Sequence, residues 1–575
     1  MKPVWLEHYE ESVPAELEIP PLTLPDILFE TTRELPDRAA TSFMGGRLDY
    51  RTLSNLVRRL AGALAQLGIK PGDRVALHLP NTPQFIIGLY GILQVGAVAV
   101  PINPLYQGEE LAFVLRDSGA RAVITLSKLY PNIVDVLDDS LPLENIIVTR
   151  ISDYFPTGLR ILFSLFKEKK DGHAYPTEGT AAGRPVLRLP SLLRAARPVM
   201  EPVPGPEDLA ILQYTGGTTG MPKGAMLTHR NLVANVLQGR SWLTSLQEGG
   251  EVFGCAIPFF HVYGLTVALN IPISIGATMV LFPQFIPRDV LEGISKEKVT
   301  FFPAVPAMYV ALSHVKGFDN YDLSSIRLYF SGAAPLPPEV KERFEGLAGG
   351  RIVEGYGLTE ASPITHANPL WGKHKTGSIG VPFPSTVARI VDLEDPSKEL
   401  PPGEEGELCI QGPQVMKGYW NQPEETAAVL RDGWLHTGDI AKMDEEGYFY
   451  IVDRKKDLVI VGGFNVYPRE IEDFLYTHPK VKEVAVVGVP HPLRGEELAA
   501  YIVLKEGQEA TRAEIVRYCR ERLHAYKVPR KIQFVDAIPK TLVGKPLRRV
   551  IREEAAATPD EGVVDEGEAG GEAPV

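Results

Sequence analysis

Apolar and polar positions near the start of the chain follow helical and strand periods in turn. Leucines spaced along one helical face predict a helix over residues 53–67, which Gly68 ends. The following apolar runs predict strands at 74–79, 97–101 and 122–126, separated by helices that begin at Asn81 or Thr82 and span 109–118. This β-α-β-α-β order predicts an α/β fold, in which a doubly wound parallel sheet carries helices on both faces.

Two long runs contain no Asp, Glu, Lys or Arg, at residues 81–107 and 262–282. A membrane-spanning helix needs about 20 consecutive apolar residues. Proline and glycine interrupt both runs, for example at Pro101 and Pro272. Each run therefore predicts a helix followed by a strand, both buried inside an α/β core.

The glycine-rich run YTGGTTGMPKG, residues 214–224, contains four glycines, three threonines and one lysine. Glycine lets successive backbone N–H groups face an anion, hydroxyl groups add donors, and a lysine adds a charge suited to phosphate. The residues that would bind phosphate are Thr215, Gly216, Gly217, Thr218, Thr219, Gly220 and Lys223. A strand at 209–213 precedes the run and a helix at 228–237, capped by Thr228, follows it, so we expect a phosphate cradle of strand, loop and helix.

This run does not fit the Walker pattern, because that pattern requires Ser or Thr after the lysine. Here Pro222 precedes Lys223 and Gly224 follows it. The run is therefore a phosphate loop of another kind, and a flexible surface turn is the alternative interpretation.

Further candidate residues lie where predicted strands end in loops. One histidine, His261, lies among aromatic residues in IPFFHVYG, and a core turn with a hydrogen-bonded histidine is the alternative. The run YFSGAA ends a strand in small residues at Gly332, where a flat ring could approach the backbone. The run EGYGLTE ends in Glu360, whose carboxylate could bind Mg²⁺ beside a triphosphate.

The C-terminal third adds a candidate ribose ligand and a second domain. Asp439 ends the run GWLHTGD and is expected in a tight turn, either as an Asx-turn residue or as an acceptor for ribose hydroxyls. The charged run DRKKD, residues 453–457, predicts a linker. Strands near 458–461, 484–489 and 498–504 alternate with helices at 468–475 and 512–523, which predicts a small α+β domain. The last 18 residues, 558–575, contain six acidic residues and predict a disordered tail.

Composition excludes some functions. The net charge of −13 argues against nucleic acid as a partner. The three cysteines are far apart in the sequence and form neither a metal-binding spacing nor a disulfide framework. The N-terminus has no apolar signal core, so we expect a cytoplasmic protein.

Residues 155–170, FPTGLRILFSLFKEKK, combine bulky apolar side chains with basic ones. Such a segment could lie on the inner face of a membrane. A surface insertion that packs on its own domain is the alternative. The sequence also leaves open whether the chain forms a homodimer.

The order of these motifs resembles that of the adenylate-forming superfamily, which includes acyl-CoA synthetases, peptide-synthetase adenylation domains and luciferases. The phosphate loop, Y-G-x-T-E, T-G-D, D-R-x-K-D and P-K-x-x-x-G-K occur in that order over residues 53–549. Residues 432–473 resemble the signature of bacterial long-chain fatty acid–CoA ligases in particular. Two positions depart from the pattern: Asn465 stands where acetate-type enzymes have arginine, and Pro546 where an aliphatic residue is commoner.

The resemblance implies an N-terminal domain at 1–453, with parallel sheets and a barrel-like β part, and a mobile C-terminal domain at 454–557. It implies ATP, CoA and a fatty acid as substrates, and Mg²⁺ as the metal. Thr215 and Glu360 would bind Mg²⁺, and Lys545 would be catalytic. The remaining implied roles are nucleotide binding by Gly332, Gly355, Tyr356, Thr359, Asp439 and Arg454, a hinge and nucleotide contact at Lys456, the acyl tunnel at His261, Val262, Tyr263 and Gly264, and the CoA passage at Gly463.

These roles agree with the chemistry of acid activation. A carboxylate and a phosphate repel each other, so a cation such as Lys545 must offset their charge as they react. One site cannot present Lys545 and admit CoA at once, which favours a small domain that moves between steps. The alternatives are transfer of the acyl group to a carrier protein or to water, a medium-chain or aryl acid as substrate, and a nucleotide-gated lipid-binding or scaffold protein without catalysis.

Overall fold

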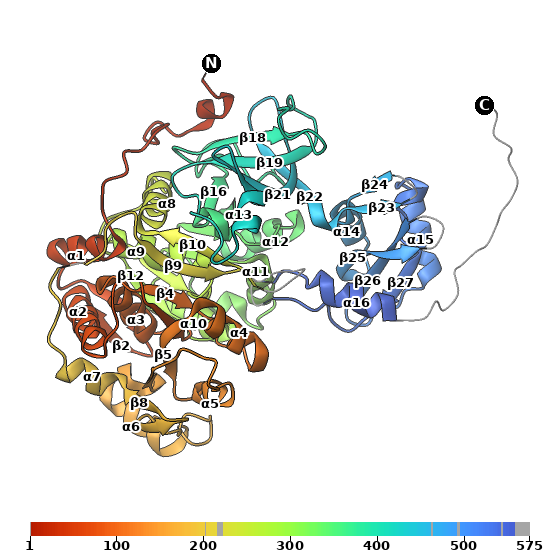
Figure 1. Ribbon diagram of the computed structural model, residues 1–575. Coiled ribbons are helices and arrows are strands. Elements are labelled where there is room, and N and C mark those ends of the chain that lie inside the picture. The colour runs from red at the N-terminus through yellow and green to blue at the C-terminus, as the bar shows by residue number, and fades with distance from the viewer. Residues whose placement is uncertain are drawn as a thin grey trace, which may run out of the picture.

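The computed structural model describes residues 2–201, 203–215, 222–461, 464–491, 495–541 and 544–557. Over these residues the chain forms three sheets of a large domain and one sheet of a small C-terminal domain (Figure 1). The predicted acidic tail, residues 558–575, lies outside the described residues. The mixed α/β class is confirmed.

The first sheet has eight strands in the order β10-β9-β4-β3-β5-β6-β8-β7. Its strands are β3 (Arg74–His78), β4 (Val98–Pro101), β5 (Ala120–Leu126), β6 (Asn145–Thr149), β7 (Gly179–Ala181), β8 (Arg184–Arg188), β9 (Leu209–Tyr214) and β10 (Gly224–Thr228). The helices along this part of the chain are α2 (Tyr50–Gln66), α3 (Pro83–Gln94), α4 (Gly108–Ser118), α5 (Tyr130–Asp135), α6 (Thr157–Phe166) and α7 (Leu189–Ala195). The strands from β9 to β8 are parallel, which confirms the predicted β-α-β-α-β unit.

The second sheet has nine strands in the order β17-β16-β15-β14-β13-β11-β12-β1-β2. Its strands are β1 (Ala39–Phe43), β2 (Gly46–Asp49), β11 (Val252–Cys255), β12 (Thr278–Leu281), β13 (Phe301–Ala304), β14 (Leu328–Ser331), β15 (Ile352–Gly357), β16 (Ile364–Ala367) and β17 (Val381–Pro382). The helices along this part are α1 (Leu24–Glu34), α8 (His229–Trp242), α9 (Ile271–Ser274), α10 (Pro287–Glu297), α11 (Pro306–Ser313) and α12 (Pro338–Ala348). Its central strands, β12 to β15, are parallel, so the loops after β14 and β15 lie at one edge.

The two uncharged runs form buried structure, as predicted. All 12 residues of α3 are buried, and β4 follows it. The second run forms a π-helix (Gly264–Asn270), then α9 and β12, all within the core. Over the described residues, no helix is long and apolar enough to span a bilayer.

The chain after the glycine-rich run differs from the predicted strand-loop-helix cradle. Strand β10 directly follows the run and pairs antiparallel with β9, so the run connects two strands of a hairpin. Helix α8 begins only after β10, with Thr228 as its N-cap as predicted. The apolar residues of β10 fit the start of an amphipathic helix as well as a short strand, because five residues are too few to reveal a period. Strand β10 therefore separates the glycine-rich run from the N-terminus of α8 along the chain.

The third sheet is antiparallel and corresponds to the β part that the resemblance implies. It contains β18 (Val387–Val391), β19 (Gly406–Gln411), β20 (Leu430–Arg431), β21 (Trp434–Met443) and β22 (Phe449–Arg454), with α13 (Pro423–Val429) beside β20. Asp439 of β21 pairs across the ladder with Arg454 of β22. The hairpin of β21 and β22 thus places two predicted nucleotide ligands side by side.

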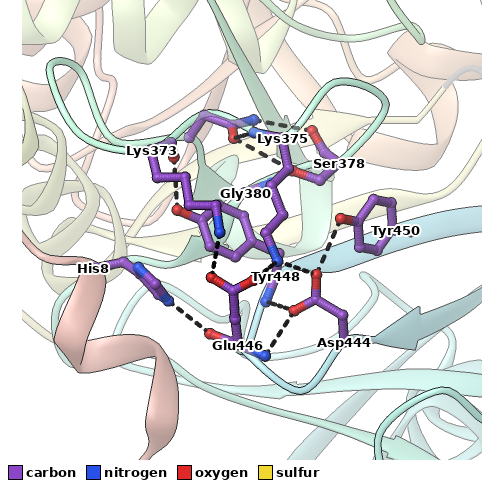
Figure 2. A network of polar contacts seen from close by, with 10 residues as sticks. His8, Lys373, Lys375, Ser378, Gly380, Asp444, Glu446, Tyr448 and Tyr450 are labelled. Carbon is purple, nitrogen blue, oxygen red and sulfur yellow. Dashed lines mark hydrogen bonds and ion pairs between the residues drawn. The ribbon is translucent and has the colours of Figure 1, made fainter.

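A polar network fixes the outer end of this hairpin (Figure 2). Lys375 Nζ lies 2.5 Å from an Asp444 oxygen and 2.8 Å from a Glu446 oxygen, and Lys373 Nζ lies 2.6 Å from Glu446. The ring nitrogen Nε2 of His8 lies 2.9 Å from the Glu446 carbonyl oxygen. Hydrogen bonds from the two lysines lower the pKa of the Glu446 carboxyl. The hairpin that carries Asp439 is therefore held by the hydrogen bonds between its two strands and, at its turn, by this network.

The small domain has its own sheet and its own core. Its strands are β23 (Val459–Val461), β24 (Phe464–Val466), β25 (Val481–His491), β26 (Gly495–Leu504) and β27 (Lys531–Phe534), and its helices are α14 (Pro468–Tyr476), α15 (Arg512–Arg520) and α16 (Arg548–Ala557). Its buried residues form clusters separate from those of the large domain. The predicted small α+β domain is confirmed, and β24, β27 and α16 are additional elements.

Candidate functional site

The candidate site lies where the ends of β14 and β15 and the start of the π-helix meet a loop of the small domain. The pocket there is lined by His261, Val262, Tyr263, Phe330, Gly332, Ala333, Gly355, Tyr356, Gly357, Leu358, Thr359, Pro363, Ile364 and Lys545. Eight of these residues were singled out from the sequence. Lys545 is the member from the small domain, and it is separated from the others by about 180 residues or more.

Lys545 reaches the pocket on a short hairpin of the small domain. The Thr541 N–H donates to the Lys545 carbonyl oxygen at 2.8 Å, and the backbones of Lys540 and Pro546 form an antiparallel β-bridge. Gly544 provides the positive φ of 79° that turns the hairpin. Desolvation in the pocket, followed by the nearby Arg454 guanidinium, lowers the pKa of Lys545 to about 8. The side chain is therefore mostly an ammonium at neutral pH and can offset negative charge in the pocket.

Asp439, Arg454 and Tyr356 form one hydrogen-bonded group. The Tyr356 hydroxyl donates to Asp439 Oδ2 at 2.5 Å, and Arg454 Nε lies 3.2 Å from Asp439 Oδ1. Asp439 was expected in a tight turn, but it lies within β21, directly after Gly438 with its φ of 70°. A glycine followed by an aspartate, as in T-G-D, is typical of a tight turn, and Gly438 does adopt a positive φ. This explains the wrong prediction. The attraction of Asp439 raises the pKa of Arg454, so the guanidinium remains charged.

Glu407 supports this group from β19 and was not predicted from the sequence. Its carboxylate accepts from the Gly438 N–H at 3.2 Å and lies 3.2 Å from Lys455 Nζ. The residue is buried, with 4% of its surface exposed. A single acidic residue inside the apolar run GELCI could have revealed it, because a buried carboxylate needs partners.

Glu360 follows the pocket residue Thr359, in the 3-10 turn Thr359–Ala361. Its Oε1 accepts from the Tyr419 hydroxyl at 2.7 Å, and Lys223 Nζ lies 5.2 Å from the Tyr419 ring centre. Lys223 also pairs with Glu425 of α13. Tyr419 and Glu425 were not predicted, since they lie far along the chain from the glycine-rich run. The structure thus links the phosphate-loop lysine and the candidate metal ligand through one aromatic ring.

The base of the glycine-rich run is closed by a hydrogen bond from Thr215 N–H to the Lys223 carbonyl oxygen, at 2.9 Å. Five predicted phosphate ligands lie outside the described residues: Gly216, Gly217, Thr218, Thr219 and Gly220. The predicted CoA-passage residue Gly463 also lies outside them.

Three of the predicted acyl-binding residues, His261, Val262 and Tyr263, line the same pocket. Burial, followed by the charge of Lys545, lowers the pKa of His261 to about 3, so its ring is neutral. The Tyr263 hydroxyl donates to the Phe330 carbonyl oxygen at 3.0 Å. Gly264 is buried beside these residues, and a Cβ there would lie 2.2 Å from the Pro258 carbonyl oxygen. Gly264 therefore permits close backbone packing, while its neighbours face the pocket.

Comparisons with known proteins agree with this geometry. Residues 28–420 match the family model described as AMP-binding enzyme, and residues 470–545 match the AMP-binding enzyme C-terminal domain. A long-chain-fatty-acid–CoA ligase of Bacillus subtilis is 46% identical over 553 residues, which cover 96% of this chain and 98% of the relative. The enzyme of the same name from Escherichia coli O6:H1 is 41% identical over 568 residues, covering 97% of this chain and 100% of the relative.

A solved structure of ATP-bound MatB from Rhodopseudomonas palustris superposes with a TM-score of 0.81 at 30% identity, covering 93% of this chain and 99% of that one. One family model thus matches the large domain, and the other matches the small domain. The chain belongs to the family of AMP-binding enzymes.

Proposed function

We propose that this protein is a long-chain fatty acid–CoA ligase, which converts ATP, a fatty acid and CoA into acyl-CoA, AMP and diphosphate. The observation that carries the proposal is the Lys545 ammonium of the small domain, which lies in a pocket walled by candidate nucleotide and acyl ligands of the large domain. The relatives from Bacillus subtilis and Escherichia coli are named long-chain-fatty-acid–CoA ligases, which supports the long-chain substrate.

In the first step, a carboxylate oxygen of the fatty acid attacks the α-phosphorus of ATP. A new P–O bond forms, the bond to diphosphate breaks, and diphosphate leaves with its electron pair. Asp439 would accept hydrogen bonds from the ribose hydroxyls, while Gly332 and Tyr356 would hold the adenine. Lys545 would stabilise the negative charge that builds between the two anions.

In the second step, the CoA thiolate attacks the carbonyl carbon of the acyl-adenylate. A C–S bond forms, the C–O bond of the mixed anhydride breaks, and AMP leaves. We propose a domain boundary at residues 453 and 454 and a hinge at Lys456, which lies in the segment Lys455–Asp457 between β22 and β23. Turning about Lys456 would remove Lys545 and open a passage for CoA at Gly463.

The side-chain oxygens of Glu360 and Thr215 are of the kind that binds Mg²⁺. Mg²⁺ in nucleotide sites usually binds one or two carboxylates together with the phosphates. Glu360 Oε1 is occupied by the Tyr419 hydroxyl, which orients the carboxylate and leaves Oε2 for a metal ion. Glu360 and the Thr215 hydroxyl would hold the ion, which when bound would neutralise phosphate charge.

The first prediction separates the two steps. Lys545→Ala should lower diphosphate release from palmitate and ATP by roughly 10²–10³-fold, because it removes the main electrostatic stabiliser of that step. Given ready-made palmitoyl-adenylate and CoA, the same variant should form palmitoyl-CoA at nearly the wild-type rate. Both products can be measured by rapid quench and chromatography.

Lys540→Ala, on the same hairpin, is the matched control and should leave diphosphate release unchanged. Equal loss of both steps in Lys545→Ala would contradict the assigned role. Wild-type protein that released AMP without forming a thioester, or that preferred an aryl acid such as ferulate to palmitate, would replace the proposed function with one of its alternatives.

The second prediction concerns the metal. Glu360→Gln keeps the shape of the side chain and removes its charge, so the adenylation rate at fixed Mg²⁺ should fall by about 100-fold. The Mg²⁺ concentration needed for half-maximal rate should rise. Glu342→Gln, an exposed residue of α12, is the control. An unchanged Mg²⁺ dependence in Glu360→Gln would exclude Glu360 as a ligand.

The exposed helix α6 supports a further part of the proposal, a contact with a membrane surface. None of its ten residues is buried. Its large apolar side chains are exposed to 40% at Leu159, 53% at Ile161, 55% at Leu162, 71% at Leu165 and 72% at Phe166. The helix is attached through Phe163, whose ring packs on Phe155 and His173. This pattern does not fit an insertion that buries its apolar side chains on its own domain.

Charge indicates which surface would fit. Arg160, Lys167, Lys169 and Lys170 are exposed around the apolar side chains. Glu168 is buried and pairs with Arg150, so its charge does not face outward. Helix α6 lies at an edge of the large domain away from the small domain (Figure 1). We infer that α6 and the lysines after it bind an anionic lipid surface, while the small domain remains clear of it.

The third prediction tests this surface with vesicles. Wild-type protein should bind phosphatidylcholine vesicles that contain phosphatidylglycerol, and binding should weaken with salt. The double variant Leu165→Ser/Phe166→Ser should lower the partition coefficient by roughly tenfold, because two large apolar side chains no longer enter the lipid. Co-sedimentation measures both effects. Ile286→Ser/Leu347→Ser, which alters two exposed apolar residues elsewhere, should bind normally; equal binding by all three proteins would contradict the inference.

A further inference from the structure

The hairpin that delivers Lys545 is joined to an ion cluster at its base. The Leu547 N–H donates to the Pro539 carbonyl oxygen at 2.8 Å and closes the hairpin, and the next residue, Arg548, begins α16. The Arg548 guanidinium is nearly buried, with 14% of its side chain exposed. It contacts Asp457 at 3.1 Å and Glu472 at 2.6 Å, both of which lie beyond the proposed hinge.

A third carboxylate of this cluster comes from the other side of the hinge. Asp453 belongs to β22, where it pairs with Ile440 of β21 in the third sheet of the large domain. Its Oδ1 lies 3.4 Å from Arg548 Nη1. The residue is buried, with 2% of its surface exposed, so water cannot readily replace its protein partners.

Asp453 also caps a helix of the small domain. Its Oδ2 accepts from the Arg469 N–H at 2.9 Å, in the first turn of α14. The N-cap residue of α14, Tyr467, provides no side-chain cap. The first N–H groups of a helix lack partners within the helix and favour an anion. A carboxylate of the large domain thus accepts from the first turn of α14, where the small domain's own N-cap residue provides no side-chain cap.

We propose that Asp453 is the positioning residue that holds Lys545 in the pocket, by joining β22 of the large domain to α14 and α16 of the small domain. This inference rests on the proposed two-step function. When the small domain turns for the CoA step, Asp453 stays with β22 while Arg469 and Arg548 leave. The contact therefore stabilises the adenylating arrangement and is absent from the other.

Asp453 differs in this respect from Asp457, which binds the same guanidinium. Asp457 follows Lys456, so it moves together with Arg548 and keeps its partner in both arrangements. A contact shifts a conformational equilibrium only by the difference in its strength between the two states. Loss of the Asp453 charge should therefore shift the equilibrium, whereas loss of the Asp457 charge should not.

The test compares Asp453→Asn with Asp457→Asn in the full-length protein. Asp453→Asn should lower diphosphate release from palmitate and ATP by about tenfold, as expected for losing one partly buried charge at a helix N-terminus and a guanidinium. Thioester formation from ready-made palmitoyl-adenylate and CoA should stay the same or become faster. Asp457→Asn should change both steps by the same factor. Asp453→Glu, which keeps the charge, should recover part of the lost adenylation.

A second measurement reports the arrangement itself and does not depend on turnover. Donor and acceptor dyes are placed on cysteines introduced at Glu404 of the large domain and Glu506 of the small domain, both exposed. The native cysteines are buried and should not be labelled. The dye-pair distribution of Asp453→Asn should shift toward the second arrangement, and that of Asp457→Asn should match wild type.

Two results would overturn the inference: equal effects of Asp453→Asn on both half-reactions, or a dye-pair distribution that matches wild type. Failure of the proposed function is distinguishable, because wild-type protein would then form no palmitoyl-adenylate, or would form it without transferring the palmitoyl group to CoA. The dye-pair comparison would still report whether Asp453 favours one arrangement.

Discussion

The candidate site depends on one electrostatic constraint: two anions must approach each other, and the cation that offsets their charge comes from a different domain. Lys545 is the cation that we propose for this role, and it lies in a pocket whose other walls belong to the large domain. Its lowered pKa of about 8 reflects the cost of removing an ammonium from water and placing it near Arg454. The position of Lys545 is therefore stable only while the rest of the structure holds the small domain against the pocket.

The remaining structure can be understood as support for that arrangement. The β21–β22 hairpin carries Asp439 and Arg454 as a cross-strand pair, and the Lys375 network fixes its outer end. The same strand β22 carries Asp453, which contacts α14 and Arg548. One strand thus presents a candidate nucleotide ligand to the pocket and a docking carboxylate to the small domain. Because Arg548 directly follows the hairpin of Lys545, the position of that hairpin is coupled to β22.

Much of the fold could be predicted from local patterns, because a helical or strand period needs only neighbouring residues. The leucine stripe of α2 and the proline at the first turn of α3 are examples. Strand β10 was missed because five residues show no clear period, and Asp439 was assigned to a turn because Gly438 precedes it. Contacts between distant residues could not be predicted, with or without the resemblance. The acid Glu407 stands out in an apolar run, but no local signal indicates that it accepts from the Gly438 N–H or that Tyr419 orients Glu360. The exposure of α6 could not be predicted either, because an apolar pattern in the sequence does not show whether another element covers the helix.

A reversible cross-link tests the central claim most directly, that the arrangement with Lys545 in the pocket performs only the first step. A Cβ at Gly544 would lie 3.3 Å from the Ala307 Cβ, close to the spacing of about 3.5–4.5 Å in a disulfide. In Ala307→Cys/Gly544→Cys, the oxidised protein should form acyl-adenylate at the rate of its reduced form and should form no thioester until a reductant is added. The cost of replacing Gly544 cancels in this comparison, because both forms carry the same substitutions. Thioester formation by the oxidised protein at the reduced rate, or loss of adenylation on oxidation, would contradict the account.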